Sequence, residues 1–193
     1  MTAFERAART TAGHLERLEA PYALVGGFAV SVRCEPRFTR DVDLVVAVQD
    51  DQAAEAIVRA LTSWDYRLLA VVEQEAAGRL ATARLAFGAD GEAVDLLFAS
   101  SGIEPEIAAA AEQLEILPGL VLPVARTGHL IALKLLAADP ISRPQDAVDL
   151  RALLDAAGPE DVEVARRAVG LIEARGFQRG RDLEAALDDL LSR

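Results

Sequence analysis

The sequence predicts an α+β fold: a mixed β-sheet flanked by helices and followed by a C-terminal bundle of helices. Up to residue 125, apolar stretches of strand length alternate with amphipathic stretches of helix length, and glycines or prolines separate them. From residue 126 to the end, only helical periodicity remains. We therefore predict two domains, residues 1–125 and residues 126–193.

In the first part, helices and strands are expected to alternate. An amphipathic helix over 2–20 ends at Pro21, which cannot continue a helix. Strands are expected at 22–25, 41–48, 66–73, 79–87 and 93–98, and helices at 27–33, 50–64 and 104–113. The prolines around 116–124 predict a short, extended segment there. The second part predicts helices at 127–138, 143–157, 159–175 and 181–191.

The composition narrows the class of protein. A net charge of −11 argues against broad, non-specific nucleic-acid binding, which usually needs a basic surface. The single cysteine, Cys34, excludes an internal disulfide, so we expect a cytoplasmic protein. We expect no membrane association, because no apolar run is long enough to span a bilayer.

Two aspartates interrupt the apolar stretch over 41–48. Asp41 and Asp43 stand at positions i and i+2, so a β-strand places their side chains on one face. Two neighbouring carboxylates repel each other, and a divalent cation between them removes that cost. Mg²⁺ prefers carboxylate oxygens and is usually held by one or two carboxylates together with substrate phosphates. The pair therefore predicts a magnesium site.

A glycine pair precedes this site in the sequence. In Leu24-Val25-Gly26-Gly27 the glycines end an apolar stretch and open the expected helix 27–33. Glycine allows close approach of the backbone to a ligand, and the free N–H groups at a helix N-terminus bind phosphates. Taken alone, the pair favours a tight strand-to-helix turn.

The order of these motifs resembles the nucleotidyltransferase superfamily of the DNA polymerase beta type. Its pattern is a glycine turn, a spacer, an Asp-hydrophobic-Asp motif and a later carboxylate within a strand, for which Asp95 is the candidate. Glu92 competes with it for that role. The resemblance implies an NTP substrate and two Mg²⁺ ions held by Asp41, Asp43 and Asp95. It also implies that Gly26 and Gly27 hold the phosphates.

A second group of motifs resembles the AbiEii-type toxins, a branch of that superfamily. Lys134 interrupts an apolar helix, and Asp146 and Asp149 follow at positions i and i+3, on one helical face. The residues before the aspartate pair, Thr39 and Arg40, complete a Thr-x-Asp-x-Asp form that is common in the branch. The resemblance implies that Thr39, Arg40 and Lys134 contact the nucleotide. It also implies that Asp146 or Asp149 supports catalysis or the acceptor.

Several of these residues have a purely structural alternative. Lys134 with Asp146 or Asp149 is also consistent with a structural ion pair between two helices. The structural role and the nucleotide-binding role are compatible. Arg33, Arg37 and Arg40 form the dense basic cluster nearest the aspartate pair. They are candidates for an RNA path and equally for ordinary surface arginines.

Together, the motifs predict Mg²⁺-dependent transfer of an NMP from an NTP to an acceptor hydroxyl. By resemblance, the protein is a toxin with a cognate antitoxin, and the acceptor is a tRNA 3′ end. One alternative is an enzyme that modifies a small hydroxylated molecule, as lincosamide nucleotidyltransferases do. Another is an inactive nucleotidyltransferase fold that serves as a binding module.

Overall fold

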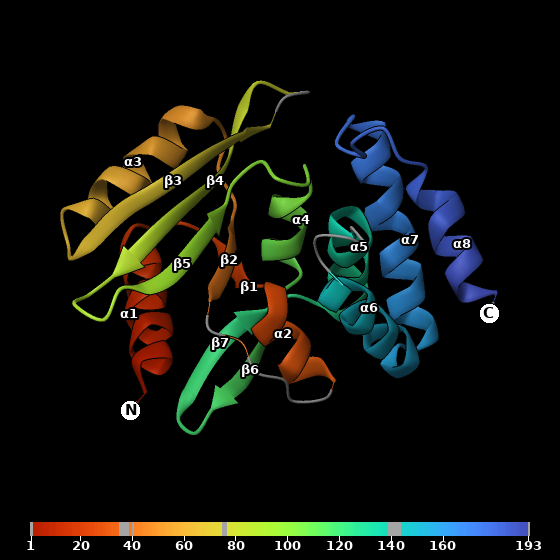
Figure 1. Ribbon diagram of the computed structural model, residues 1–193, viewed down its shortest axis with the longest axis horizontal. Helices are drawn as coiled ribbons and strands as arrows, with labels where there is room; N and C mark the ends of the chain where they lie inside the picture. The colour runs from red at the N-terminus through yellow and green to blue at the C-terminus, as the bar shows by residue number, and fades with distance from the viewer. Residues whose placement is uncertain (1, 35–38, 40, 75–76, 139–143, 193) are drawn as a thin grey trace.

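The computed structural model describes residues 2–34, 39, 41–74, 77–138 and 144–192. Its strands form one seven-stranded mixed sheet in the order β3-β4-β5-β2-β1-β7-β6 (Figure 1). The strands are β1 Tyr22–Leu24, β2 Val42–Val46, β3 Tyr66–Gln74, β4 Arg79–Phe87, β5 Glu92–Leu97, β6 Glu112–Leu117 and β7 Leu120–Val124. The predicted α+β fold is confirmed.

Strand β2 lies in the middle of this sheet. It pairs antiparallel with β1 on one side and parallel with β5 on the other. Val42, Leu44, Val45 and Val46 are buried completely. The apolar character of the strand reflects burial on both faces, which is typical of strands at the centre of a sheet with parallel pairing. Asp43 therefore introduces a carboxyl group into the centre of the fold.

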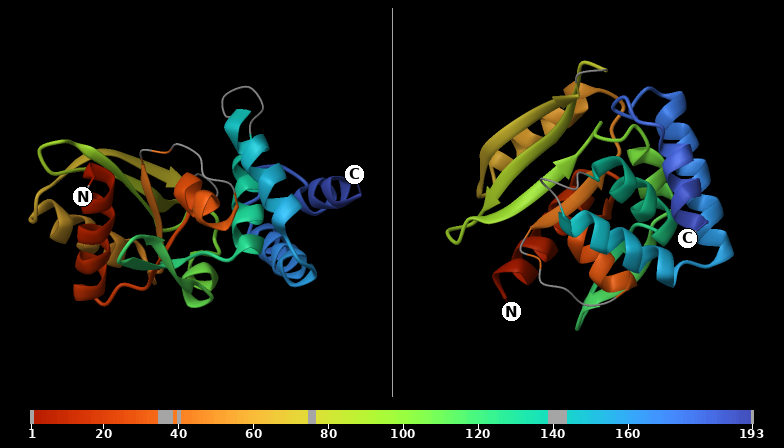
Figure 2. Two further views of the ribbon diagram at one scale, coloured as in Figure 1. Left: turned by 90° about the horizontal axis from the view of Figure 1, so that it is seen from below. Right: turned by 45° about the vertical axis from the view of Figure 1, so that its right-hand side comes forward.

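Helices cover the sheet and extend from one end of it. The sheet carries α1 Ala3–Arg17, α2 Gly26–Arg33, α3 Asp51–Thr62 and α4 Glu104–Ala109. The remaining helices lie together beside the sheet, on the right in Figure 1 (Figures 1 and 2). They are α5 Thr127–Ala137, α6 Pro144–Ala156, α7 Pro159–Ala174 and α8 Leu183–Leu191. The Asp50 side chain accepts a hydrogen bond from the Ala53 N–H (2.9 Å), so it caps α3 as its position predicts.

The segment after β5 differs from the prediction. The expected helix 104–113 ends at Ala109, and residues 112–124 form the β6–β7 hairpin rather than one extended segment. Pro118 and Gly119 make the turn, and Gly119 has a φ of +72°, which favours glycine. The alanines over 108–111 continue the helical pattern in sequence, and the pairing of β7 with β1 takes the chain into the sheet instead.

The hydrophobic core continues across the predicted domain boundary. One cluster of buried side chains includes Leu24 and Leu44 from the sheet together with Leu130 and Leu153 from the C-terminal helices. The division at residues 125 and 126 stays a prediction. Among the described residues, no helix is both long enough and apolar enough to cross a bilayer.

Candidate active site

The glycine turn lies directly against Asp43. The Val25 N–H donates a hydrogen bond to the Asp43 C=O (2.9 Å), which joins the end of β1 to the middle of β2. A Cβ at Gly26 would lie 1.9 Å from Asp43 Oδ2, and Gly26 has a φ of +66°. Both the contact and the backbone angle therefore require glycine at this position. Gly27 is the buried second residue of α2.

The sheet brings the three predicted aspartates together. Asp43 on β2 is aligned with Asp95 on the parallel strand β5, and Asp41 directly precedes β2. Burial, followed by the charges of Asp95 and Asp41, raises the pKa of Asp43 to about 6, against the opposing effect of Lys134 and Arg84. The three carboxyl groups thus share one region of negative potential. Asp95 is the partner of Asp43 in register, whereas Glu92 pairs with Phe87 at the other end of β5.

Arg84 is a site residue that the sequence interpretation missed. It lies on β4 opposite Asp95, and its Nε and Nη2 donate to the two Asp95 carboxylate oxygens (2.8 and 2.7 Å). The same Nη2 donates to Asp41 Oδ2 (2.9 Å). These carboxylates raise the pKa of the guanidinium further above its ordinary value, so it is charged at all accessible pH values.

A signal for Arg84 is nevertheless present in the sequence. It is the one charged residue between Leu80 and Phe87 in the expected strand 79–87. A hairpin closed by the two glycines Gly88 and Gly91 places residue 84 opposite residue 95. The pairing of these oppositely charged residues could have been derived from the turn alone.

The second predicted cluster also forms. Lys134 Nζ on α5 contacts Asp146 Oδ1 (2.6 Å) and Asp149 Oδ2 (2.7 Å) on α6. All three residues are buried, with 9%, 8% and 1% of their surface exposed respectively. The interhelical ion pair is therefore present. Lys134 also lowers the pKa of Asp43, so its charge acts on the aspartate site.

Lys134, Asp146 and Asp149, the Lys134 cluster, contain an oxygen without a hydrogen-bond partner among the described residues. This oxygen is the buried Asp146 Oδ2, whereas Asp149 Oδ1 accepts a hydrogen bond from the Gln145 side chain (3.2 Å). A buried acceptor without a donor costs free energy unless a ligand or water satisfies it. This oxygen favours Asp146 over Asp149 as the acid that contacts a bound molecule.

The predicted basic cluster is only partly described. Arg40 and Arg37 lie outside the described residues, and Thr39 is half-buried between undescribed neighbours. The Arg33 guanidinium donates to the backbone carbonyls of Val124 (3.2 Å) and Ala125 (3.0 Å), and its Nη1 contacts Glu112 (2.6 Å). Arg33 thus fixes α2 to the β6–β7 hairpin, which favours the structural alternative for this residue.

The donor set of the aspartate site suits a hard divalent cation. Asp41, Asp43 and Asp95 supply carboxylate oxygens from neighbouring positions on β2 and β5. In the described part of the chain, however, no group of three or more acidic, histidine or cysteine side chains is already arranged around a metal position. The carboxylates of Asp41 and Asp95 face a guanidinium instead. The chemistry of the carboxylates fits a divalent cation, and Arg84 contacts two of the three.

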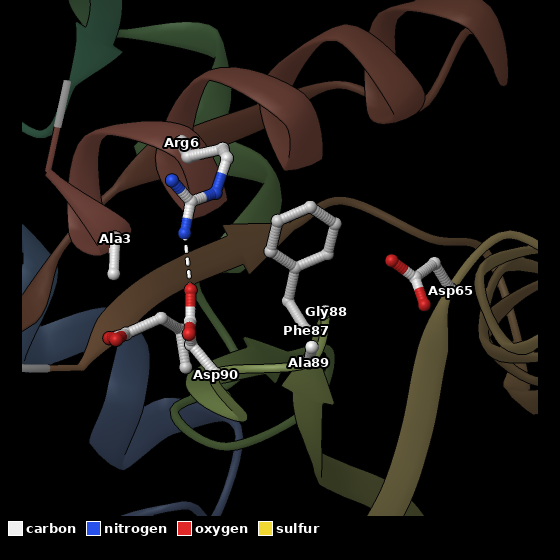
Figure 3. A pocket seen from close by; sticks show the side chains of 8 residues that line it. Ala3, Arg6, Asp65, Phe87, Gly88, Ala89 and Asp90 are labelled. Atoms are coloured by element: carbon white, nitrogen blue, oxygen red, sulfur yellow. Dashed lines mark hydrogen bonds and ion pairs between the residues drawn. The ribbon is translucent and has the colours of Figure 1, made fainter.

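A separate pocket lies between the β4–β5 turn and the start of α1. It has a volume of about 240 Å³ and is lined by α1 and turn residues that include Arg6, Phe87 and Asp90 (Figure 3). Arg6 and Asp90 form an ion pair across it. Glu92, the competing candidate for the third carboxylate, lines this pocket, whereas Asp41, Asp43, Asp95 and Lys134 do not.

Comparison with solved structures shows the same fold. An antigenic nucleotidyltransferase-like protein from Paracoccidioides brasiliensis is 19% identical, with 96% of this chain and 92% of that chain covered and a TM-score of 0.55. ANT(2″)-Ia in complex with adenylyl-2″-tobramycin is 18% identical, with 90% of this chain and 99% of that chain covered and a TM-score of 0.59. MenT4, a nucleotidyltransferase toxin from Mycobacterium tuberculosis H37Rv, is 17% identical, with 86% of this chain and 62% of that chain covered and a TM-score of 0.50.

Comparison with curated proteins finds no significant match. A protein-family model does match the sequence over nearly its whole length. The family is described as "Nucleotidyl transferase AbiEii toxin, Type IV TA system", and the match covers residues 14–193, which include the glycine turn, the aspartates and the Lys134 cluster. The chain therefore belongs to the AbiEii nucleotidyltransferase toxin family.

Proposed function

We propose that the protein transfers a nucleoside monophosphate from an NTP to an acceptor hydroxyl, with Mg²⁺ as cofactor. The observation that carries this proposal is the alignment of Asp43 with Asp95 across β2 and β5, with Gly26 directly against Asp43. In the reaction, the acceptor oxygen forms a bond to the α-phosphorus. The bond from that phosphorus to the β-phosphate oxygen breaks, and pyrophosphate leaves.

The carboxylates are assigned by their positions. Asp41 and Asp43 would hold the ion that binds the triphosphate, and Asp95 would hold a second ion with them. Bound metal ions supply charge neutralisation and lower the pKa of the attacking hydroxyl. The Gly26 turn lies directly against the Asp43 side chain and limits where its carboxyl group can lie.

The phosphates are assigned to the N-terminus of α2. The N-cap residue of this helix is Val25, whose side chain has no oxygen to accept a hydrogen bond from the first turn. The N–H groups behind Gly26 and Gly27 are thus available to the β- and γ-phosphates. Lys134 would neutralise charge on the departing pyrophosphate, and its effect on the pKa of Asp43 supports this role. Thr39 and Arg40 remain candidates for nucleotide contacts.

For the acceptor, we propose an RNA hydroxyl such as the tRNA 3′ end, on the basis of family membership. A small hydroxylated molecule is the second candidate. The charge of −11 and the structural use of Arg33 favour it, since both reduce the basic surface available to RNA. A cognate antitoxin is the expected partner in the toxin case.

One labelling experiment tests these alternatives. Purified protein is incubated with each α-labelled NTP and Mg²⁺, either with total tRNA or with a panel of small hydroxylated compounds. Label in tRNA supports the toxin proposal, and label in a small compound supports the second candidate. If neither acceptor is labelled and calorimetry detects no binding of Mg·NTP, the inactive binding module is the correct interpretation.

A further inference from the structure

Arg84 uses the same oxygen atoms that a metal ion at this site would need. Its guanidinium bonds to both carboxylate oxygens of Asp95 and to Oδ2 of Asp41. Parallel hydrogen bonds from one guanidinium to one carboxylate are the strongest geometry for such a pair. A metal ion that takes Asp95 as a ligand therefore competes with Arg84 for these oxygens and for the negative charge that holds the guanidinium.

The negative charges of the three aspartates explain why the Arg84 guanidinium lies beside them. Asp43 and Asp95 lie in register on neighbouring strands, and one guanidinium contacts both Asp95 and Asp41, so up to three negative charges gather here. Arg84 offsets part of their repulsion from its position on β4. The sheet is then stable with the carboxylates side by side before any metal ion arrives.

The arginine also has room to leave. The Arg84 side chain is 45% exposed, whereas that of Asp95 is 15% exposed. The guanidinium can move into solvent by rotation of its own side chain, and the strand positions of Asp43 and Asp95 need not change. A buried lysine or arginine would have no comparable route.

We propose that Arg84 is the resident counterion of the metal site and sets its metal affinity. In the metal-free protein, it holds Asp41 and Asp95 in place. A divalent cation must displace it, so Arg84 weakens metal binding while it stabilises the metal-free fold. This inference rests on the proposed metal site. It adds that the affinity of that site is determined by a residue that is not a metal ligand.

Direct measurement of Mn²⁺ binding to the full chain tests this inference without reference to activity. Free Mn²⁺ is followed by electron paramagnetic resonance, with and without a non-hydrolysable NTP analogue. Arg84→Met removes the competing cation, and we expect it to bind Mn²⁺ about tenfold more tightly, in line with the loss of a charge-assisted bidentate pair. Arg67→Met, an exposed arginine on the adjacent strand β3, is the matched control and should leave the affinity unchanged.

Thermal melting provides the second readout. Metal-free Arg84→Met should melt below the wild type and gain more from added Mn²⁺, because its carboxylates then lack a counterion. If Arg84→Met does not fold, Arg84→Lys keeps one charge but cannot form two parallel bonds to Asp95, and it should show a smaller increase in affinity. Asp95→Asn assigns the signal: Arg84→Met should increase the affinity less in that background, because only the contact with Asp41 is then left to remove.

The outcomes separate this inference from the proposed function. Equal or weaker Mn²⁺ binding by Arg84→Met, with clear binding by the wild type, overturns the counterion role and leaves the metal site intact. Absence of Mn²⁺ binding by the wild type and by Arg84→Met, with and without the nucleotide analogue, overturns the metal site and the inference together. Tighter Mn²⁺ binding by Arg84→Met, a smaller increase for Arg84→Lys and unchanged binding by Arg67→Met support the inference.

Discussion

Gly26 and Asp43 are in such close contact that neither residue can be placed independently of the other. A Cβ at Gly26 would lie 1.9 Å from Asp43 Oδ2 and 2.7 Å from its Cβ. The hydrogen bond from the Val25 N–H to the Asp43 carbonyl fixes the same two segments through the backbone. The phosphate turn and the first metal carboxylate of the proposed site are therefore one structural unit.

Gly26→Ala should separate these two residues and abolish transfer. The positive φ alone costs about 1–2 kcal/mol of stability for a residue with a Cβ. Gly119→Ala is a matched control, because Gly119 has a φ of +72° and nothing within 4 Å of an added Cβ. We expect Gly119→Ala to lose stability in urea unfolding and keep its activity, whereas Gly26→Ala loses more stability and its activity as well. Similar activity in both variants would contradict the close contact.

Asp43→Asn should remove activity without loss of stability. The amide has almost the same shape but no charge, so the burial cost of the charge and the repulsion from Asp95 and Asp41, which together raise the pKa of Asp43, disappear. We expect a melting temperature equal to or above that of the wild type. Transfer should fall at least about a hundredfold, since a metal ligand supplies several kcal/mol of transition-state stabilisation. Asp90→Asn, an exposed acid at the β4–β5 turn, is the control with unchanged activity. Wild-type rates in Asp43→Asn would contradict the mechanism.

The sequence predicted the aspartate site in two ways. Asp41 and Asp43 share a face by the period of two, whereas Asp95 was the candidate for the third carboxylate through the resemblance to the superfamily, with Glu92 as its competitor. The pairing of β2 with β5 confirms that these residues meet. Asp146 and Asp149 share a helical face for the analogous reason, and both contact Lys134.

Other features depend on tertiary contacts that local patterns do not contain. The β6–β7 hairpin forms because β7 pairs with β1, whereas the alanines before it favour a longer helix. Arg33 is close in sequence to the aspartates, and only the fold shows that it binds the carbonyls of Val124 and Ala125. Arg84 has a signal in its hairpin, but its contact with Asp41 requires the register of three strands.

Lys134→Met should destabilise the protein strongly. It leaves two carboxyl groups buried without their cation, and loss of one partner of a buried ion pair typically costs about 3–5 kcal/mol. The triple variant Lys134→Met/Asp146→Asn/Asp149→Asn removes the charges together and should recover most of that stability in urea unfolding. Weak Mg·NTP binding by this stable variant in calorimetry supports contact of this cluster with the nucleotide. Wild-type affinity there would show that the cluster is only structural.

Expression of the wild type alone in a bacterial host should arrest growth, as expected for a toxin of this family. Asp43→Asn should relieve the arrest at equal protein level, because it removes a carboxylate proposed to be essential while it preserves the fold. Growth is followed after induction, and immunoblotting confirms equal expression. Arrest by both proteins would show that toxicity does not depend on the aspartate site.

His129 should make stability fall as the pH decreases. It is buried in the first turn of α5, and burial, followed by Arg126 and reinforced by Arg167, lowers its pKa from 6.5 to about 4 despite the opposing charge of Glu106. The unfolded chain therefore binds a proton at a pH where the folded protein does not. Stability from this residue is complete above pH 6.5 and is lost as the pH falls toward 4.

The matched measurement compares the wild type with His129→Leu by urea unfolding at two pH values. Between about pH 7.5 and about pH 5.5, the wild type should lose about 1 kcal/mol more than the variant. His14, whose pKa is also lowered by burial, and the three site aspartates are present in both proteins, so their contributions cancel in the difference. Parallel pH dependence of the two proteins would mean that His129 is protonated in the folded state as readily as in the unfolded chain.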